Sequence, residues 1–307
     1  VRGVIYTDNQ GGYIDNVGGV LDASQSARFR PAGTVRENGT VVQPNRAGFQ
    51  AGADLSDVNF ISANNASIAD KNINDTSYQG FRLSGLYEFN ADWRLNVAHA
   101  QQRLDADGVF FADPELDDYD VVRFSEDKIE DSYHNTSWTL DGRLGALEAV
   151  YTGAYTERTT DQIVDYSDYL FVAQYLPYYI CDGSVSYPGA AAPSGTCYAP
   201  NLFVKSSTET EIQTHELRFN TPDAYRIRAT FGGFFSDLEL RELNDFTYPG
   251  STQILGFNGE VGFAPNYPLT NTAVTGAVGN ASPGYFSEPG PFPAGVIFRN
   301  DVKRTDK

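Results

Sequence analysis

The sequence YQGFRLSGLYEFNADWRLNVAHAQQ, from Tyr78 to Gln102, decides the fold. Apolar residues occupy alternate positions on both sides of a polar break at residues 90–92, and polar or charged residues stand between them. This period of two around a short turn predicts a β-hairpin with one apolar and one polar face. A soluble sandwich would turn the apolar face into a core, whereas a transmembrane barrel would turn it to lipid, and the hairpin alone does not choose between them. The apolar positions are Phe81, Leu83, Tyr87, Phe89, Trp93, Leu95 and Val97, and the polar ones include Arg82, Glu88, Arg94 and Asn96.

The same alternation recurs along the chain and predicts an all-β protein. We expect an antiparallel up-and-down meander of about seven strands, with a small helix near residues 51–58 as the one helical exception. The residues after 242 are rich in proline and glycine and are expected to form loops, including GPFPAG at residues 290–295. The predicted strands are residues 1–8, 78–89, 93–104, 122–141, 145–159, 208–221 and 225–242.

The lengths of the connections favour the barrel over the sandwich. Short connections are predicted at residues 90–92, 141–145 and 221–224, and they alternate with long ones at residues 18–75, 104–121, 160–207 and 243–298. A sandwich has no reason to alternate in this way. Outer-membrane barrels have short periplasmic turns at one end and long extracellular loops at the other. The sequence therefore predicts part of a large transmembrane β-barrel.

Composition excludes several classes of function. The chain has 307 residues, with 22 basic against 40 acidic ones, and this balance argues against binding nucleic acid, which needs a basic surface. No stretch is apolar for long enough to form a transmembrane helix. The chain contains no Met and starts within a predicted strand, so we expect it to be a piece of a longer protein. Cys181 and Cys197 lie in one irregular segment and are expected to form a loop-closing disulfide.

Three stretches resemble a known family: RGVIYTDNQGGYIDNV at residues 2–17, NDTSYQGFRLSGLYEFNADWRLNVAHAQQRLDADG at residues 74–108, and THELRFNTPDAYRIRATFGGFFSD at residues 214–237. They are similar to barrel segments of TonB-dependent outer-membrane receptors of Gram-negative bacteria. The resemblance implies a barrel of about 22 strands closed by an N-terminal plug domain. It also implies location in the outer membrane and uptake of a scarce solute (a ferric siderophore, cobalamin or an oligosaccharide) driven by the TonB complex. The plug, the coupling segment and the last strands are not in this chain.

Aromatic residues in the long connection at 160–207 are the candidates for ligand contact. Tyr and Phe offer flat surfaces that lose little entropy on binding a sugar or a siderophore ring. The alternative is that these side chains pack on one another around the disulfide. The candidates are Tyr166, Tyr169, Phe171, Tyr175, Tyr178 and Tyr179.

Charged residues on the polar face are expected to line the lumen. They would be solvated, would form salt bridges to the plug domain, or would form a basic track for an anionic solute. Three arginines beside the turn at 221–224 favour plug contact over first capture of a ligand. The candidates are Arg82, Glu88, Arg94, Glu216, Arg218, Arg226 and Arg228, with Glu148 and Arg158 on the same face.

The sequence does not point to an enzyme or to a metal site. It contains no GxSxG, P-loop or GxGxxG motif, and the acidic stretch at residues 105–120 lacks the spacing of an EF-hand. His99, His134 and His215 are predicted to lie on the outward, lipid-side face, where they would not converge on a metal. We therefore expect a receptor without a cofactor or resident metal. A secreted all-β protein that binds or hydrolyses carbohydrate is the alternative.

Overall fold

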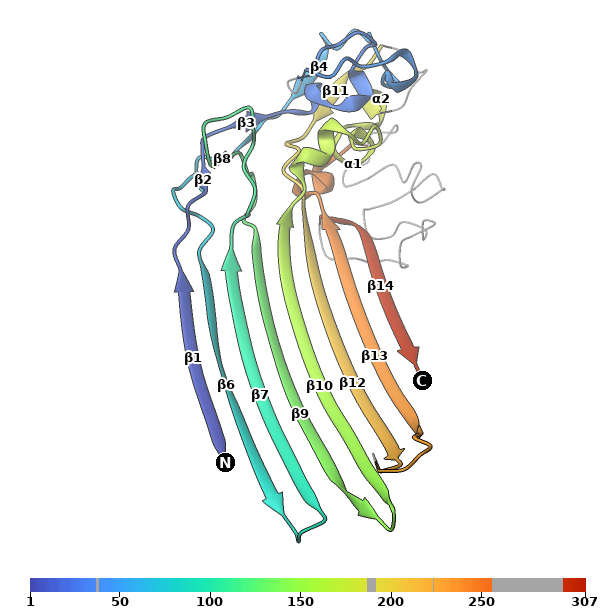
Figure 1. Ribbon diagram of the computed structural model, residues 1–307. Coiled ribbons are helices and arrows are strands. Elements are labelled where there is room, and N and C mark those ends of the chain that lie inside the picture. The colour runs from blue at the N-terminus through green and yellow to red at the C-terminus, as the bar shows by residue number, and fades with distance from the viewer. Residues whose placement is uncertain (37–38, 187–191, 223, 256–294) are drawn as a thin grey trace.

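A computed structural model gives the fold, and it describes residues 1–36, 39–186, 192–222, 224–255 and 295–307. Eight long strands form one antiparallel, curved sheet in which every strand pairs with its neighbour along the chain (Figure 1). This meander confirms the predicted topology at the level of an all-antiparallel sheet. The strands are β1 (Arg2–Gln10), β6 (Thr76–Glu88), β7 (Arg94–Asp107), β9 (Lys128–Leu144), β10 (Leu147–Asp165), β12 (Phe203–Asn220), β13 (Thr230–Thr247) and β14 (Val296–Asp306).

The long connections gather at one end of the sheet, and we call their described parts the cap (Figure 1). The cap contains only short elements, and its residues are 11–75, 108–127, 166–202 and 248–255. Its strands are β2 (Asp15–Asn16), β3 (Val20–Leu21), β4 (Val58–Phe60), β5 (Ala63–Asn64), β8 (Asp120–Val121) and β11 (Gly195–Cys197). Its helices are α1 (Pro177–Ile180) and α2 (Gly183–Ser186), with 3-10 turns η1 (Ala23–Gln25), η2 (Ala27–Phe29), η3 (Pro44–Arg46), η4 (Ser167–Phe171) and η5 (Pro249–Gln253).

The structure corrects several of the predicted boundaries. Residues 51–57 form turns and β4 follows, so the predicted helix at 51–58 is wrong. The predicted loop over the last residues is wrong from Val296 onward, because β14 pairs with β13 there. The connection after β12 runs from residue 221 to residue 229, so it is longer than predicted. Of the GPFPAG sequence, residues 290–294 lie outside the described residues.

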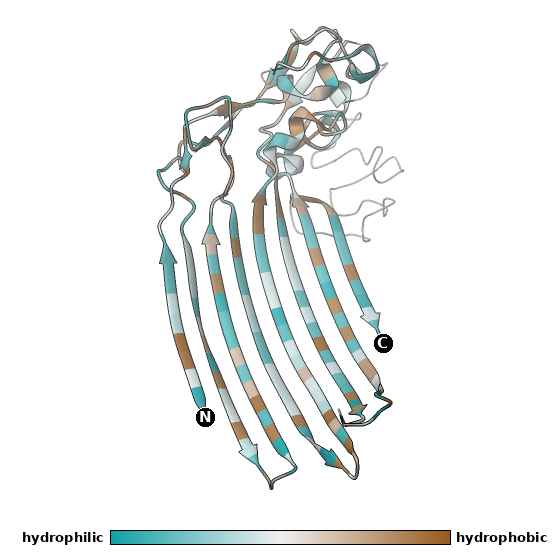
Figure 2. Ribbon diagram, in the orientation of Figure 1, coloured by the Kyte–Doolittle hydropathy of each residue, from teal (hydrophilic) through white to brown (hydrophobic). Residues whose placement is uncertain are grey.

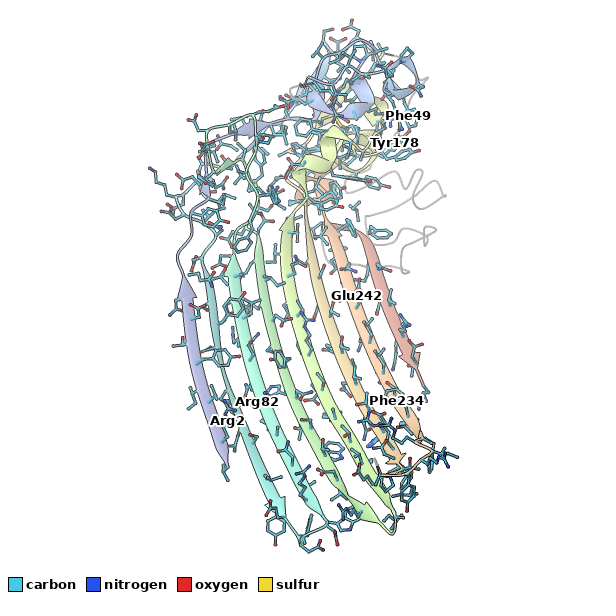
Figure 3. The ribbon with its side chains drawn as sticks, viewed as in Figure 1. Arg2, Phe49, Arg82, Tyr178, Phe234 and Glu242 are labelled. Atoms are coloured by element: carbon cyan, nitrogen blue, oxygen red, sulfur yellow. A yellow bond between two sulfur atoms is a disulfide. The ribbon has the colours of Figure 1, made fainter. Side chains whose placement is uncertain are left out.

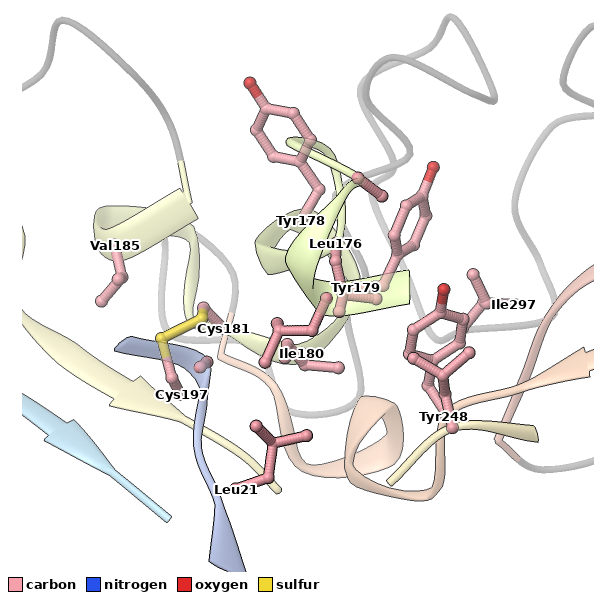
Figure 4. Packing of buried hydrophobic residues seen from close by; sticks show 14 of the residues in the cluster. Leu21, Leu176, Tyr178, Tyr179, Ile180, Cys181, Val185, Cys197, Tyr248 and Ile297 are labelled. Carbon is pink, nitrogen blue, oxygen red and sulfur yellow. A yellow bond between two sulfur atoms is a disulfide. The ribbon is translucent and has the colours of Figure 1, made fainter. Parts of the chain in front are cut away.

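The hydrophobic core lies in the cap and not under the sheet (Figure 4). Fully buried side chains from well-separated stretches meet there, among them Leu170, Ile180 and Leu202. A disulfide joins Cys181 to Cys197, and both cysteines are completely buried in this core. Burial of this apolar surface is the main source of order in a region with little regular secondary structure.

The two faces of the sheet follow opposite chemistry, and apolar and polar residues alternate along the long strands (Figure 2). One face, which we call the apolar face, carries large side chains near the short turns; these include Leu83, Leu95, Trp138, Leu140, Tyr151, Leu217, Phe219, Phe231 and Phe235. The opposite, polar face carries mostly small or polar residues at the same height; these include Arg82, Asn96, Asn135, Ser137, Thr139, Thr152, Thr156, Thr214 and Ser236. Among the described residues, no helix is both long and apolar enough to cross a membrane.

Candidate functional site

The structure divides the predicted aromatic contact residues into two groups. Tyr178 and Tyr179 are each 3% exposed and lie in the core of the cap, and Phe171 packs against that core. These three side chains therefore have the alternative role, packing around the disulfide. Tyr166 and Tyr169 are accessible, with exposures of 38% and 42%. They line a hollow between the cap and the end of the sheet.

Tyr175 is the remaining predicted contact residue, and it lies away from this hollow. Its ring is 40% exposed and packs beside Phe49 and Tyr178, with ring centres 5.6 Å and 6.3 Å away. Figure 3 shows Phe49 and Tyr178 in the cap, far from Arg82 on the sheet. Tyr175 therefore belongs to the surface of the cap itself.

The hollow, which we call the aromatic hollow, has a volume of about 570 Å³ and is built from three parts of the chain. Phe110 and Phe111 follow β7, Ile129 stands at the start of β9, and Tyr166 and Tyr169 follow β10. The rings of Tyr166 and Tyr169 are 5.3 Å apart, and Tyr166 also packs edge-on against Phe246 of β13 at 6.0 Å. The lining also includes Gly108, Val109, Arg123, Asp127, Lys128, Gln162, Ile163, Val164, Asp165, Asp168 and Val172.

Arg123 organises the polar side of the hollow. Its guanidinium donates to both carboxylate oxygens of Asp127, at 2.8 and 3.2 Å, to Asp168 at 3.2 Å and to the carbonyl oxygen of Asp165 at 2.7 Å. Burial by itself would lower the pKa of Arg123, but the hydrogen bond to Asp127 and the three surrounding carboxylates outweigh it, and the pKa is raised. The guanidinium is therefore a fixed cation whose donors are committed to the protein.

Asp165 fixes the loop that carries the two tyrosines. One of its carboxylate oxygens accepts from the backbone N–H groups of Phe124 and Ser125, and the other accepts from Ser167 N–H at 2.7 Å. An aspartate that accepts from the residue two positions onward is typical of a turn, so β10 ends at this residue and η4 begins. Tyr166 lies within that turn and Tyr169 follows it, and both residues line the hollow.

The predicted lumen residues lie on the polar face wherever the structure places them in strands. Strand register puts Arg82, Glu88, Arg94, Glu216 and Arg218 on that face, together with Glu148 and Arg158. Four of them form ion pairs: Arg94 with Asp141 at 2.5 Å, Arg158 with Asp131 at 2.8 Å, and Arg218 with Glu216 at 3.2 Å. Arg226 and Arg228 were predicted in a strand, but β13 begins at Thr230 and both lie in the preceding connection. They therefore have no assigned face.

The three histidines lie on the apolar face, in register with its large side chains. His99 is bonded to Thr136 at 2.9 Å, and His215 is bonded to the hydroxyl of Tyr151 at 2.7 Å. The rings of His99 and His134 are 6.3 Å apart. Over the part of the chain that the structure describes, no cluster of three His, Cys, Asp or Glu residues could hold a metal.

Sequence reasoning missed Phe110, Phe111, Arg123, Asp165 and Asp168 as residues of one site. Residues 105–120 were interpreted as an acidic loop, and the Phe110-Phe111 pair inside this polar stretch was the signal that could have marked it. Their meeting with Tyr169 depends on the pairing of β7 with β9 and of β9 with β10.

The chain was also compared with protein-family models, with curated proteins and with solved structures, and none of the three comparisons found a match.

Proposed function

We propose that this chain forms part of the wall and the outer loops of a β-barrel receptor in the outer membrane of a Gram-negative bacterium. In this proposal the apolar face contacts lipid, the polar face lines the lumen, and the cap captures a scarce solute without covalent chemistry. The TonB-dependent receptors that the sequence resembles suggest the partners, a plug domain and the TonB complex. The finer fold in the proposal is a closed barrel of about 22 strands, to which these eight strands contribute.

The observation that carries the proposal is the change from apolar to charged residues along one row of the apolar face. A row here means residues that stand opposite one another on successive strands. One such row on the apolar face begins with Ile5 on β1 and Phe81 on β6. The same row later contains three glutamates, Glu157 on β10, Glu211 on β12 and Glu239 on β13, and it reaches Thr305 on β14. On β13 the apolar residues of this face near the short turns reach Phe235, four positions closer to those turns than Glu239, and Leu243 lies on the same face nearer the cap. Apolar and charged residues of one face therefore share a single row.

Strand tilt would place the two ends of one row at different heights in a membrane. A flat lipid layer imposes a level apolar band, and barrel strands tilt by roughly 35–45° to the membrane normal. Strands about 4.8 Å apart with a rise of about 3.4 Å per residue then shift the band by about 1.0 to 1.4 residues per strand. Over the five steps from β6 to β13 this would amount to about 5 to 7 positions. The limit near the short turns is four positions lower on β13 (Phe235) than on β6 (Phe81), and it falls unevenly, because Val97 on β7 already stands four positions below the row and Tyr155 on β10 only two. The support for the proposal is therefore the change from Phe81 to three glutamates within one row, and not a constant slope.

Exposure supports the same assignment. Ile5 is 88% exposed, Leu83 is 52% exposed and Phe235 is 50% exposed, and all three stand on one face. A contiguous apolar surface of this kind on a soluble protein would promote association. In the proposed barrel it is covered by lipid, and the location of the core in the cap is then expected.

Thiol labelling at two positions of this row tests the proposal. Both native cysteines are joined in the disulfide, so an introduced thiol is the reactive one. We expect Phe81→Cys to resist a water-soluble maleimide in isolated outer membranes and Glu239→Cys to react readily, although the two positions share a row and a face. Equal labelling of both variants would contradict the membrane assignment and favour the secreted all-β alternative.

A further inference from the structure

We propose that the aromatic hollow binds a neutral oligosaccharide, and not an anionic solute such as a ferric siderophore. This inference rests on the proposed receptor function and narrows its solute to one chemical class. It comes from two properties of the lining, the aromatic faces that it presents and the way in which its charges are already paired.

The first property is the number of accessible rings around a space of moderate size. Phe110 and Phe111 are 59% and 56% exposed, and Tyr166 and Tyr169, which follow the end of β10, line the same hollow. Large rings at such exposure are costly in water unless they bind a partner. A volume of about 570 Å³ lies in the usual range for small-molecule sites. The rings offer flat, weakly polar platforms that suit the C–H faces of sugar rings.

The second property is the absence of an uncommitted counter-charge in the described lining. Arg123 is bound to Asp127 and Asp168, and Lys128 is paired with Glu130 at 2.6 Å. The five charged residues of the lining are two cations, Arg123 and Lys128, and three anions, Asp127, Asp165 and Asp168, so their formal sum is −1. An anion would enter a site of the same sign, and to gain a partner it would have to displace a carboxylate from the buried Arg123 or compete with Glu130 for the exposed Lys128.

A neutral polyol avoids this cost and still finds hydrogen-bond partners. The carboxylate of Asp168 is 67% exposed, although one of its oxygens contacts Arg123, and Gln162 also lines the hollow. A carboxylate can accept hydrogen bonds from hydroxyl groups, and an amide can both accept and donate them, without a change of charge. The combination of ring platforms with a few polar groups is what a sugar requires, while a charged ligand requires a free charge.

Binding measurements with matched variants test the inference. The detergent-purified protein is titrated by calorimetry with neutral hexasaccharides of α-1,4-glucan, β-1,4-glucan and β-1,4-xylan, and with an oligogalacturonate and a ferric catecholate as anionic probes. We expect at least one neutral hexasaccharide to bind and both anions not to bind. Tyr169→Ala should weaken that binding on the order of 3- to 10-fold, because one ring contact is lost. Tyr169→Phe should retain it.

Tyr175→Ala is the matched control, because Tyr175 is 40% exposed against 42% for Tyr169 but lies outside the hollow. It should leave binding unchanged. Failure of every neutral hexasaccharide to bind, stronger binding of an anion that depends on Tyr169, or an equal loss in Tyr169→Ala and Tyr175→Ala would each overturn the inference. Labelling of Phe81→Cys and Glu239→Cys in isolated outer membranes shows separately whether the receptor proposal has failed.

Discussion

Replacing Leu83 by arginine separates the two possible environments of the apolar face. Leu83 projects from β6 between Gly3 and His99, and its side chain is 52% exposed. If that exposed half faces lipid, an arginine near the membrane mid-plane should cost about 2–4 kcal/mol of folding free energy. If it faces water, the same change should stay within about 0.5 kcal/mol, as at other half-exposed positions. The two environments therefore differ by a measurable amount.

The assay is urea unfolding of the protein folded into lipid vesicles, in which the free energy follows from the midpoint and the slope. A loss of about 2–4 kcal/mol corresponds to a shift of roughly 30- to 700-fold in the folding equilibrium. Arg82→Ala is the matched control, because it changes the adjacent residue on the polar face and should alter stability little. A Leu83→Arg variant as stable as the parent, or a larger loss in Arg82→Ala, would refute the assignment of the faces.

Two further predictions concern the cap. Arg28 is completely buried and donates to Gln50, to the hydroxyl of Tyr178 and to backbone oxygens of Gln174 and Ser186, so Arg28→Met should destabilise the cap by roughly 3–5 kcal/mol. Hydrogen exchange of the cap measures this, and the exposed Arg46→Met is the control. Removing the disulfide in a double Cys181→Ser, Cys197→Ser variant should lower the stability of the cap by about 3 kcal/mol, the value expected for a loop of this length. Faster proteolysis between residues 177 and 202 measures this loss. Unchanged proteolysis would show that packing alone holds this segment.

The sheet was largely predictable because its signal is local. Alternation with period two predicted the central parts of seven strands, where one face is apolar and the other polar. The prediction failed toward the cap, where both faces are polar. β10 continues to Asp165 beyond its predicted end, and β14 was missed because VIFRNDVKRTD alternates weakly. In those parts, pairing with an existing neighbour supplies the hydrogen bonds, and no apolar pattern is needed.

The aromatic hollow was only partly predictable, because it is assembled by tertiary pairing. Tyr166 and Tyr169 were selected as exposed aromatics in a long connection, and they line the hollow. Tyr178 and Tyr179, selected by the same rule, are buried. Composition alone could not distinguish them, because an aromatic residue in a loop near a disulfide serves equally well as core or as contact surface. Whether such a residue is buried or exposed depends on where the core lies, and the core includes residues as distant in sequence as Leu21 and Tyr248.

The strongest argument for two different solvents is that one chain obeys opposite burial rules in its two parts. In the cap, Leu170, Ile180 and Leu202 are completely buried, as water requires of large apolar side chains. On the sheet, Ile5 and Leu83 remain exposed while the other face carries mostly small or polar residues. If water surrounded the whole chain, large apolar side chains would be expected to be buried in both parts. The exposure of Ile5, and the change from Phe81 to glutamates in the same row, would then have no physical reason. In the proposed barrel, a change of solvent at that level, from lipid beside the short turns to water around the cap, would account for both parts with the same hydrophobic effect.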